Sequence, residues 1–127
     1  MPYAGRFVMA LTIIFSLGLW LEAHSQEGEF VYVVAYLEVD PTSVEEVAEL
    51  LKRYRSNTQD ASGNLRSEIL QRINRPSHFS FIEEWQDEAS FVTHSSSDYA
   101  QALHSALTPH LTSPYDERRH FGLEVAR

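Results

Sequence analysis

Apolar side chains occupy both alternating sets of positions between Phe30 and Val39, in the sequence FVYVVAYLEV. β-Branched and aromatic residues at a period of two predict a β-strand, because successive side chains of a strand point to opposite faces. One face carries Val31, Val33, Ala35, Leu37 and Val39, and the other carries Phe30, Tyr32, Val34 and Tyr36. Since both sets are apolar, we expect both faces of this strand to be covered.

The period of the pattern changes after Asp40-Pro41-Thr42, a group of residues that breaks the strand. Ser43, with Glu46 three residues later, has the form of a capping box, in which the two side chains bond free backbone N–H groups at a helix start. Apolar residues then recur at helical spacing, at Val44, Val47, Ala48, Leu51 and Tyr54. Charged residues fill most positions between them, so we predict an amphipathic helix.

The second half of the chain begins with strand patterns over residues 64–73 and 78–85, which predict a hairpin around Arg75-Pro76-Ser77. Asp87 is placed to cap a short helix, which the serines at 95–97 interrupt. A further helix carries one stripe formed by Tyr99, Ala102, Leu103, Ala106 and Leu107. Residues 115–125 predict a last strand, with Phe121, Leu123 and Val125 at a period of two.

The predicted order of elements, β-α-β-β-α-β, is that of the split βαβ, ferredoxin-like arrangement. In this α+β fold a four-stranded antiparallel sheet carries its helices on one face. The opposite face would be formed by Phe30, Tyr32, Val34 and Tyr36 of the first strand, with Phe79 and Phe81 or their neighbours on the third. That apolar surface exceeds what a monomer of this size normally exposes, so we expect a homodimer whose two sheets pack face to face.

Composition limits the size of the protein and the chemistry open to it. The 127 residues, 43% of them hydrophobic, suffice for one compact domain. A formal net charge of −8, from 10 Lys+Arg and 18 Asp+Glu, disfavours nucleic acid and anionic membrane surfaces as partners. The chain has no cysteine, which excludes thiolate metal sites, thiol nucleophiles and disulfides. Any chemistry must therefore use His, carboxylates, Tyr, Trp or a borrowed cofactor.

The first 25 residues differ from the rest of the chain. Arg6 is followed by an uncharged run from Phe7 to Leu21, which is shorter than the about 20 residues that a membrane span needs. Ala23-His24-Ser25 places small residues where signal peptidase cleaves. We therefore predict a signal peptide over residues 1–25 and a mature domain over 26–127 that is exported, periplasmic or secreted, and free of the membrane after cleavage. An uncleaved N-terminal membrane anchor is the alternative.

Residues 81–94, with the sequence FIEEWQDEASFVTH, resemble the signature of the antibiotic biosynthesis monooxygenase (ABM) superfamily. The shared features are an apolar strand ending in Glu-Trp, a few polar residues, an Ala, and a His one helix later. The resemblance extends from about Val31 to Val125. It implies a dimeric α+β barrel, and an activity among quinol monooxygenases, cofactor-free oxidases of polyketide aromatics and heme-degrading enzymes.

His94 resembles the histidine of the family's helix and is the candidate catalytic residue. A neutral imidazole there could take a proton from a phenol or hydroquinone, giving an anion that dioxygen oxidises without metal or flavin. The resemblance thus predicts a cofactor-independent monooxygenase acting on a small electron-rich aromatic such as a quinol. Trp85, Phe91 and Tyr99 are the candidate substrate-binding residues, although Trp85 is also typical of plain core. Tyr99 stands where quinol-oxidising relatives often carry a second His.

His104 follows His94 by ten residues and matches, by spacing, the iron-ligating His of the heme-degrading branch. That branch also uses a first-strand Asn, where this chain has Ala35, and a Trp in place of His94. His104 is therefore a further candidate for ligand contact, with a half-exposed surface position as the alternative. The alternative function is a non-catalytic dimeric barrel that binds heme or another planar apolar ligand. The five mature histidines are scattered and predict no metal site built from protein ligands alone.

Overall fold

The computed structural model describes residues 29–123, and the predicted signal peptide lies outside them. The elements run in the order β1 (Val31–Glu38), α1 (Val44–Gln59), β2 (Asn64–Arg72), β3 (Arg75–Trp85), α2 (Glu88–Ser95), α3 (Asp98–Leu107) and β4 (Asp116–Phe121). Two short 3-10 turns, Pro41–Ser43 and Thr108–His110, precede α1 and follow α3. The predicted ferredoxin-like order is confirmed, with its second helical region divided into α2 and α3.

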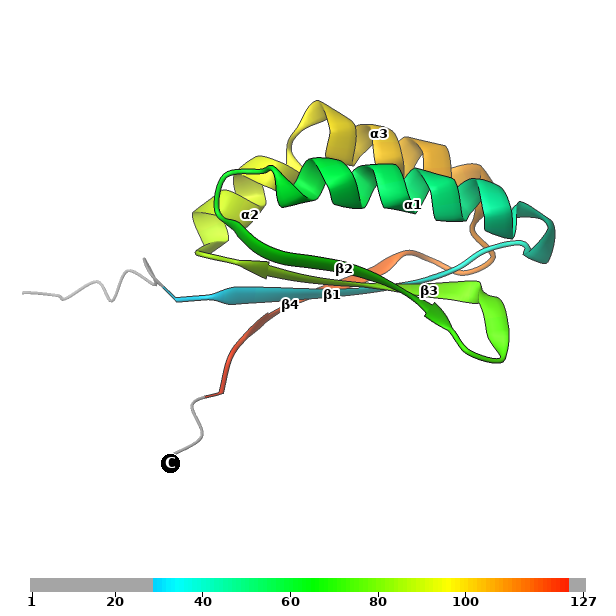
Figure 1. The fold of residues 1–127 in the computed structure, drawn as a ribbon, viewed down its shortest axis with the longest axis horizontal. Coiled ribbons are helices and arrows are strands. Elements are labelled where there is room, and N and C mark those ends of the chain that lie inside the picture. The colour runs from blue at the N-terminus through cyan, green and yellow to red at the C-terminus, as the bar shows by residue number, and fades with distance from the viewer. Residues whose placement is uncertain (1–28, 124–127) are drawn as a thin grey trace, which may run out of the picture.

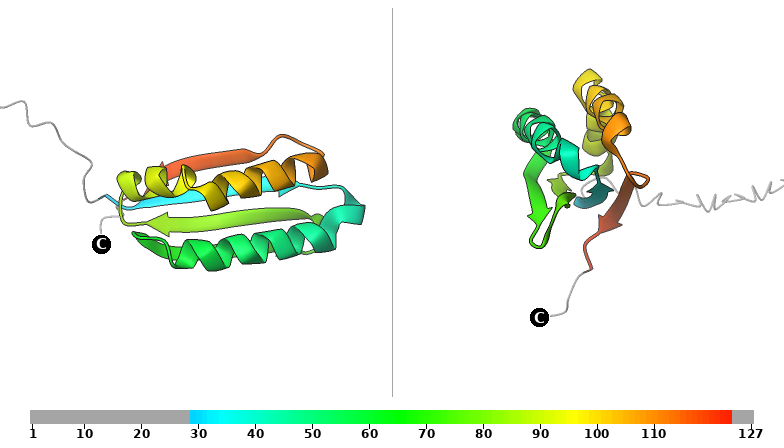
Figure 2. Two further views of the ribbon diagram at one scale, coloured as in Figure 1. Left: turned by 90° about the horizontal axis from the view of Figure 1, so that it is seen from above. Right: turned by 90° about the vertical axis from the view of Figure 1, so that its right-hand side faces the viewer.

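The four strands form one antiparallel sheet in the order β2-β3-β1-β4. All three helices lie on the same face of this sheet (Figure 1). Seen from above, α1 runs along the β2 side of the sheet, and α2 with α3 runs along the β4 side (Figure 2). Within residues 29–123 no helix lies on the opposite face of the sheet, as the sequence predicts.

The core lies between the sheet and the helices. In β1 every second residue is buried, in agreement with the predicted alternation, and Ala35 is fully inaccessible to solvent. Ala35 belongs to a large cluster that also holds Leu37, Val39, Val47, Leu51, Phe79, Phe81, Leu103 and Leu107. A smaller cluster of Val31, Val33, Trp85 and Phe91 lies where α2 meets the sheet.

The contribution of this core to stability can be tested at Leu51, because its side chain is fully buried in the large cluster. Replacement of Leu51 by alanine is expected to lower the free energy of unfolding by about 2–5 kcal/mol, from lost burial and the cavity left behind. Urea denaturation followed by circular dichroism measures the change. Leu65→Ala is the matched control, since Leu65 is 52% exposed and its loss should cost about 0.5 kcal/mol or less. Equal losses in both variants would contradict the packing described here.

The start of α1 differs from the sequence prediction. Ser43 makes no capping hydrogen bond, so the predicted capping box is wrong. The chain enters α1 through the 3-10 turn, which leaves Ser43 at φ −102° and ψ 1° instead of in the extended conformation typical of a cap. Asp40 caps that turn by accepting from the Thr42 N–H at 2.8 Å. The Ser43 hydroxyl instead bonds Nδ1 of His110 at 2.9 Å.

The hairpin turn and the end of the last strand also differ from prediction. The hairpin turns at Ile73-Asn74, with Asn74 at φ 39°, so Arg75-Pro76-Ser77 belongs to β3 and not to the turn. Asparagine tolerates this left-handed conformation better than most residues, which explains the position of the turn. The last strand ends at Phe121, earlier than predicted, and Leu123 is 92% exposed. Val125 lies outside the described residues.

On the helix-free face of the sheet the third strand contributes the neighbours of Phe79 and Phe81, which is one of the two predicted alternatives. Phe79 and Phe81 are buried beneath the helices, because they pair with Leu37 and Ala35 on the inward side of β1. Their neighbour Ile82 takes the outward side of β3, opposite Val34. We call the outward set of Tyr32, Val34, Tyr36, Leu70, Ser80 and Ile82 the open face. Tyr36 is 54% exposed, so the prediction that both sides of β1 are covered does not hold within one chain.

Candidate functional site

A chain of hydrogen bonds runs through the space between the sheet and the helices. His94 of α2 bonds Tyr99 of α3 through Nδ1, at 2.6 Å from the phenol oxygen. Its Nε2 lies 2.7 Å from the phenol oxygen of Tyr54 on α1. Tyr54 in turn bonds Oε1 of Glu83 on β3 at 3.0 Å, and the indole N–H of Trp85 donates to Oε2 of Glu83 at 3.0 Å. We call these five side chains the polar network.

Local structure explains how each side chain reaches the network. Glu83 and Trp85 lie two residues apart on β3, so both point toward the helices. Asp87 caps α2 by accepting from the Ser90 N–H at 2.7 Å, as predicted, which places His94 in the last turn of that helix. Ser97 then starts α3 with Tyr99 in its first turn. The short break between the two helices therefore brings His94 and Tyr99 together.

Burial controls the charge states of the network. His94 is 4% exposed, and this desolvation lowers its pKa to about 4, so the imidazole is neutral at physiological pH. Burial likewise raises the pKa of Glu83, although hydrogen bonds from Trp85 and Tyr54 partly oppose the shift. The pKa of Tyr54 is raised far above its ordinary value, first by burial and then by the charge of Glu83. Burial also raises the pKa of Tyr99.

The aromatic candidates Trp85 and Phe91 lie behind His94. The Trp85 ring is fully buried, with its centroid 4.5 Å from that of the His94 imidazole. Phe91 is 5% exposed and meets Trp85 edge-on at 6.1 Å. Both rings therefore pack against the imidazole. Neither ring lines the groove between α1 and α3 or the cavity between α1 and β2.

A groove between α1 and α3 is lined in part by two members of the network, Tyr54 and Tyr99. Its volume is about 310 Å³, within the range of small-molecule sites. Besides these two tyrosines, the lining residues are Leu50, Arg53, Asn57, Ala102, Leu103 and Ala106. Ala102 and Ala106 contribute small side chains to the α3 side of the groove. His94 does not line the groove, and its two ring nitrogens are bonded to Tyr54 and Tyr99, so a ligand in the groove would contact these two tyrosine side chains and not the imidazole.

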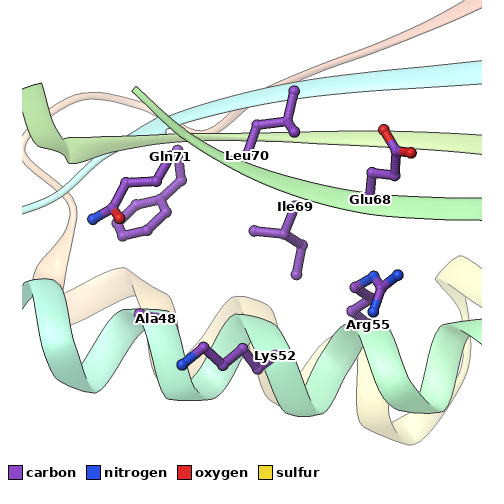
Figure 3. Close-up of a pocket in the computed structure, with 8 residues that line it drawn as sticks. Ala48, Lys52, Arg55, Glu68, Ile69, Leu70 and Gln71 are labelled. Atoms are coloured by element: carbon purple, nitrogen blue, oxygen red, sulfur yellow. The ribbon is translucent and has the colours of Figure 1, made fainter. Parts of the chain in front are cut away.

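A larger cavity, of about 510 Å³, lies between α1 and β2 (Figure 3). Ile69 points toward α1 in this view, and Leu70 points to the other side of the strand (Figure 3). The cations of its wall are engaged elsewhere: Arg55 donates to the Ser67 carbonyl oxygen at 2.9 Å, and Lys52 bonds Glu49 at 2.7 Å. None of the polar network lines this cavity, so its size alone does not make it the reactive site.

His104 is separate from the network. Its side chain is exposed on α3 and packs edge-on against Tyr115, with ring centroids 4.7 Å apart. No hydrogen bond within residues 29–123 joins His104 to His94 or its partners. The surface position that the sequence offered as the alternative is the one observed. Across the same part of the chain, no group of three or more His, Asp or Glu side chains is arranged to hold a metal ion.

Two members of the network, Tyr54 and Glu83, were not predicted as site residues. Tyr54 fits the apolar stripe of α1, where an aromatic ring is ordinary core. Glu83 carries a clearer signal, because it stands at an inward position of β3 between Phe81 and Trp85. A carboxylate among buried aromatic side chains needs partners, which marks it as a site candidate.

Comparison with known proteins agrees with the fold and identifies the family. A conserved protein from Methanosarcina mazei Go1 is 26% identical with a TM-score of 0.69, covering 75% of this chain and 94% of that one. A solved antibiotic biosynthesis monooxygenase is 23% identical with a TM-score of 0.67, covering 76% and 99%. The protein Rv0793 from Mycobacterium tuberculosis is 16% identical with a TM-score of 0.71, covering 77% and 99%. No curated protein matches the chain significantly.

The fold and the buried network define an α+β, ferredoxin-like domain with a hydrogen-bonded polar network between its sheet and its helices. Residues 30–106 match the family model described as antibiotic biosynthesis monooxygenase. The chain therefore belongs to the antibiotic biosynthesis monooxygenase family. Within the described part of the chain, no helix has the length and apolar character to cross a membrane.

Proposed function

We propose that the protein is a monooxygenase that oxidises a small electron-rich aromatic, such as a hydroquinone, with dioxygen and without a bound cofactor. The observation that carries this proposal is the neutral His94, joined through Nδ1 to Tyr99, whose side chain lines the groove between α1 and α3. A neutral imidazole held behind a phenol can accept a proton from a hydroxyl group that reaches that phenol.

The chemistry begins with proton loss from the substrate. A substrate hydroxyl in the groove donates to the oxygen of Tyr99, while Tyr99 donates its own proton to Nδ1 of His94. The resulting anion is electron-rich and transfers electrons to dioxygen. One oxygen atom enters the ring and the other leaves as water, so a hydroquinone becomes a hydroxyquinone and itself supplies all the electrons. No external reductant is needed.

The assembly we propose is a homodimer joined through the open face. This surface combines exposed or half-exposed apolar side chains on three neighbouring strands, including Leu70 at 46% and Tyr36 at 54% exposure. A second copy of the sheet would cover it and would leave the groove between α1 and α3 free on the helical side. The dimer is therefore compatible with substrate entry from that groove.

Tyr99→Phe tests the proposed function most directly, because it removes one hydroxyl and keeps the ring. We expect oxygen uptake with a panel of hydroquinones and polyhydroxylated aromatics to fall by about 10²-fold, since the proton path to His94 is broken. An oxygen electrode measures the rate, with autoxidation subtracted in protein-free samples. Tyr36→Phe makes the same chemical change on the open face and should retain the wild-type rate.

Equal rates for the wild type and Tyr99→Phe would contradict the proposed path. If wild-type uptake does not exceed autoxidation with any substrate, the catalytic proposal fails for those compounds. A heme titration would then test the binding alternative, for which a Soret shift that disappears in His104→Ala is the supporting result.

A further inference from the structure

The polar network ends at a carboxylate on the side away from the groove. Glu83 is 2% exposed and lies behind Tyr54, which separates it from His94. The proposed proton path to His94 does not use Glu83. A buried carboxylate at one end of a hydrogen-bond chain can nevertheless accept a proton when another proton enters the chain at the opposite end.

We propose that Glu83 stores the proton that leaves the substrate. When a proton reaches Glu83, every hydrogen bond between Tyr99 and Glu83 reverses its direction, and the tautomer of His94 switches. This inference rests on the proposed function for the source of the proton. Glu83 does not touch the substrate, so it is a positioning residue that acts through Tyr54 and His94.

The first arrangement of the chain has Glu83 ionised. A carboxylate only accepts hydrogen bonds, so Tyr54 donates to Oε1. The oxygen of Tyr54 then accepts from Nε2–H of His94 across 2.7 Å. Because a neutral imidazole has one donor and one acceptor nitrogen, Nδ1 of His94 must accept from Tyr99. His94 is therefore the Nε2–H tautomer, and Tyr99 has a free acceptor position for a substrate hydroxyl.

The second arrangement has Glu83 protonated on Oε1. The oxygen Oε2 receives the indole N–H of Trp85 in both arrangements, which leaves Oε1 as the position for the proton. The carboxyl group then donates to Tyr54, Tyr54 donates to Nε2 of His94, and Nδ1–H of His94 donates to Tyr99. His94 is again neutral, but it is the Nδ1–H tautomer.

The transfer between the two arrangements balances as a proton relay. The substrate O–H bond breaks and its proton joins the oxygen of Tyr99. The former phenol proton of Tyr99 joins Nδ1 of His94, the Nε2 proton joins Tyr54, and the former phenol proton of Tyr54 joins Oε1 of Glu83. One negative charge moves from Glu83 to the substrate anion, and no group is oxidised or reduced.

The surroundings of Glu83 favour a carboxyl group that gains and loses a proton. Within residues 29–123 no Lys or Arg forms an ion pair with it, so only the hydrogen bonds from Trp85 and Tyr54 oppose the effect of burial on its charged form. The titratable groups around it are Tyr54 on α1, His94 on α2, Tyr99 on α3, Tyr115 just before β4 and Glu117 on β4, and the neutral indole of Trp85 on its own strand donates to it. On β2 it faces Ser67, whose carbonyl oxygen accepts from Arg55. The negative charge of Glu117 further favours protonation of Glu83.

A purely structural role for Glu83 makes a different prediction. A permanently ionised Glu83 would hold Tyr54 and Trp85 in place and fix His94 as the Nε2–H tautomer at every pH. The tautomer of His94 therefore separates a proton store from a structural anchor. It can be observed in the protein alone, without substrate or turnover.

The experiment is ¹⁵N NMR of the histidine ring nitrogens in the full chain, between about pH 5 and about pH 9, where His94 stays neutral. We expect the wild type to change from the Nδ1–H tautomer at low pH to the Nε2–H tautomer at high pH. Glu83→Gln should remain the Nδ1–H tautomer throughout, because the amide N–H₂ donates to Tyr54 while its oxygen accepts from Trp85. Tyr54→Phe should abolish the pH dependence by breaking the chain. Glu84→Gln, one position along on the outward side of β3, is the matched control and should behave as the wild type.

A single tautomer across the pH range in the wild type would overturn the proposal, and so would a tautomer change that persists in Glu83→Gln. If Glu83→Gln does not fold, the comparison of the wild type with Tyr54→Phe decides the question by itself. The NMR result is also independent of the proposed function: a tautomer switch without oxygen uptake would retain the relay and reject the oxidation.

Turnover gives a second readout of the same step. When Glu83 is already protonated it cannot accept another proton, so kcat should fall as the pH is lowered through the raised pKa of Glu83. Glu83→Gln should lower kcat and remove this acidic limb of the pH profile. Persistence of the limb in the variant would assign it to another group and overturn the storage role.

Discussion

Replacement of His94 by glutamine is expected to lower enzyme-dependent oxygen uptake by about 10²–10⁴-fold, which is the usual contribution of a positioned general base. The imidazole is the only group in the polar network that bonds both phenols. It remains neutral down to a pH of about 4, so it is available as a base throughout the physiological range. Glutamine can still hydrogen-bond but cannot take up a proton, and the proton path would stop at residue 94.

The choice of glutamine over alanine separates catalysis from folding. Alanine would leave the ring of Trp85 without the imidazole that packs against it, with ring centroids 4.5 Å apart, and the phenols of Tyr54 and Tyr99 would lose their shared partner. Glutamine is of similar length and offers a donor and an acceptor. A variant with a melting temperature near that of the wild type and no uptake would establish His94 as the base. Wild-type uptake in a folded His94→Gln protein would exclude it.

Replacement of Ile82 by glutamate is expected to convert the proposed dimer into a monomer. Ile82 lies on β3, one of the two central strands, and faces outward opposite Val34. In a single chain the new carboxylate would remain in water, so the fold should persist. In a dimer joined through the open face, two new carboxylates would lose hydration in the interface, at a cost of several kcal/mol. We expect the dissociation constant to rise by about 10²-fold or more, since each 1.4 kcal/mol corresponds to about tenfold.

Sedimentation equilibrium of the wild type and the variant measures this change. Val92→Glu provides the matched control, because Val92 is 46% exposed on α2 and lies on the helical side of the sheet. It introduces the same charge away from the open face and should leave the dimer unchanged. A wild type that is monomeric at all concentrations, or an Ile82→Glu protein that remains dimeric, would show that the open face is not the dimer interface.

The order of the elements could be predicted from the sequence because it depends on local periodicity. The alternation of β1 and the helical stripe of α1 each reflect the geometry of one element, and the buried residues Val33 and Leu51 fall where these patterns place them. Asp87 likewise caps α2 through a bond to a residue three positions later, a contact that a linear pattern can predict. The sequence by itself therefore determined the fold class and most of the inward-facing positions.

Contacts between elements distant in sequence decided the rest. Ser43 was predicted to cap α1, but its hydroxyl bonds His110, which lies 67 positions later in the chain. The helix α3 and the turn that follows it bring His110 next to Ser43. Phe79 and Phe81 face inward because of their register with β1, which a strand pattern alone does not fix. The site depends on tertiary structure most of all: His94 was predicted, but its bonds to Tyr54 and, through Tyr54, to Glu83 join α2, α1 and β3. Hydrogen bonds between side chains of separate elements leave no periodic signal in the sequence, so only the packing of the helices on the sheet determined this network.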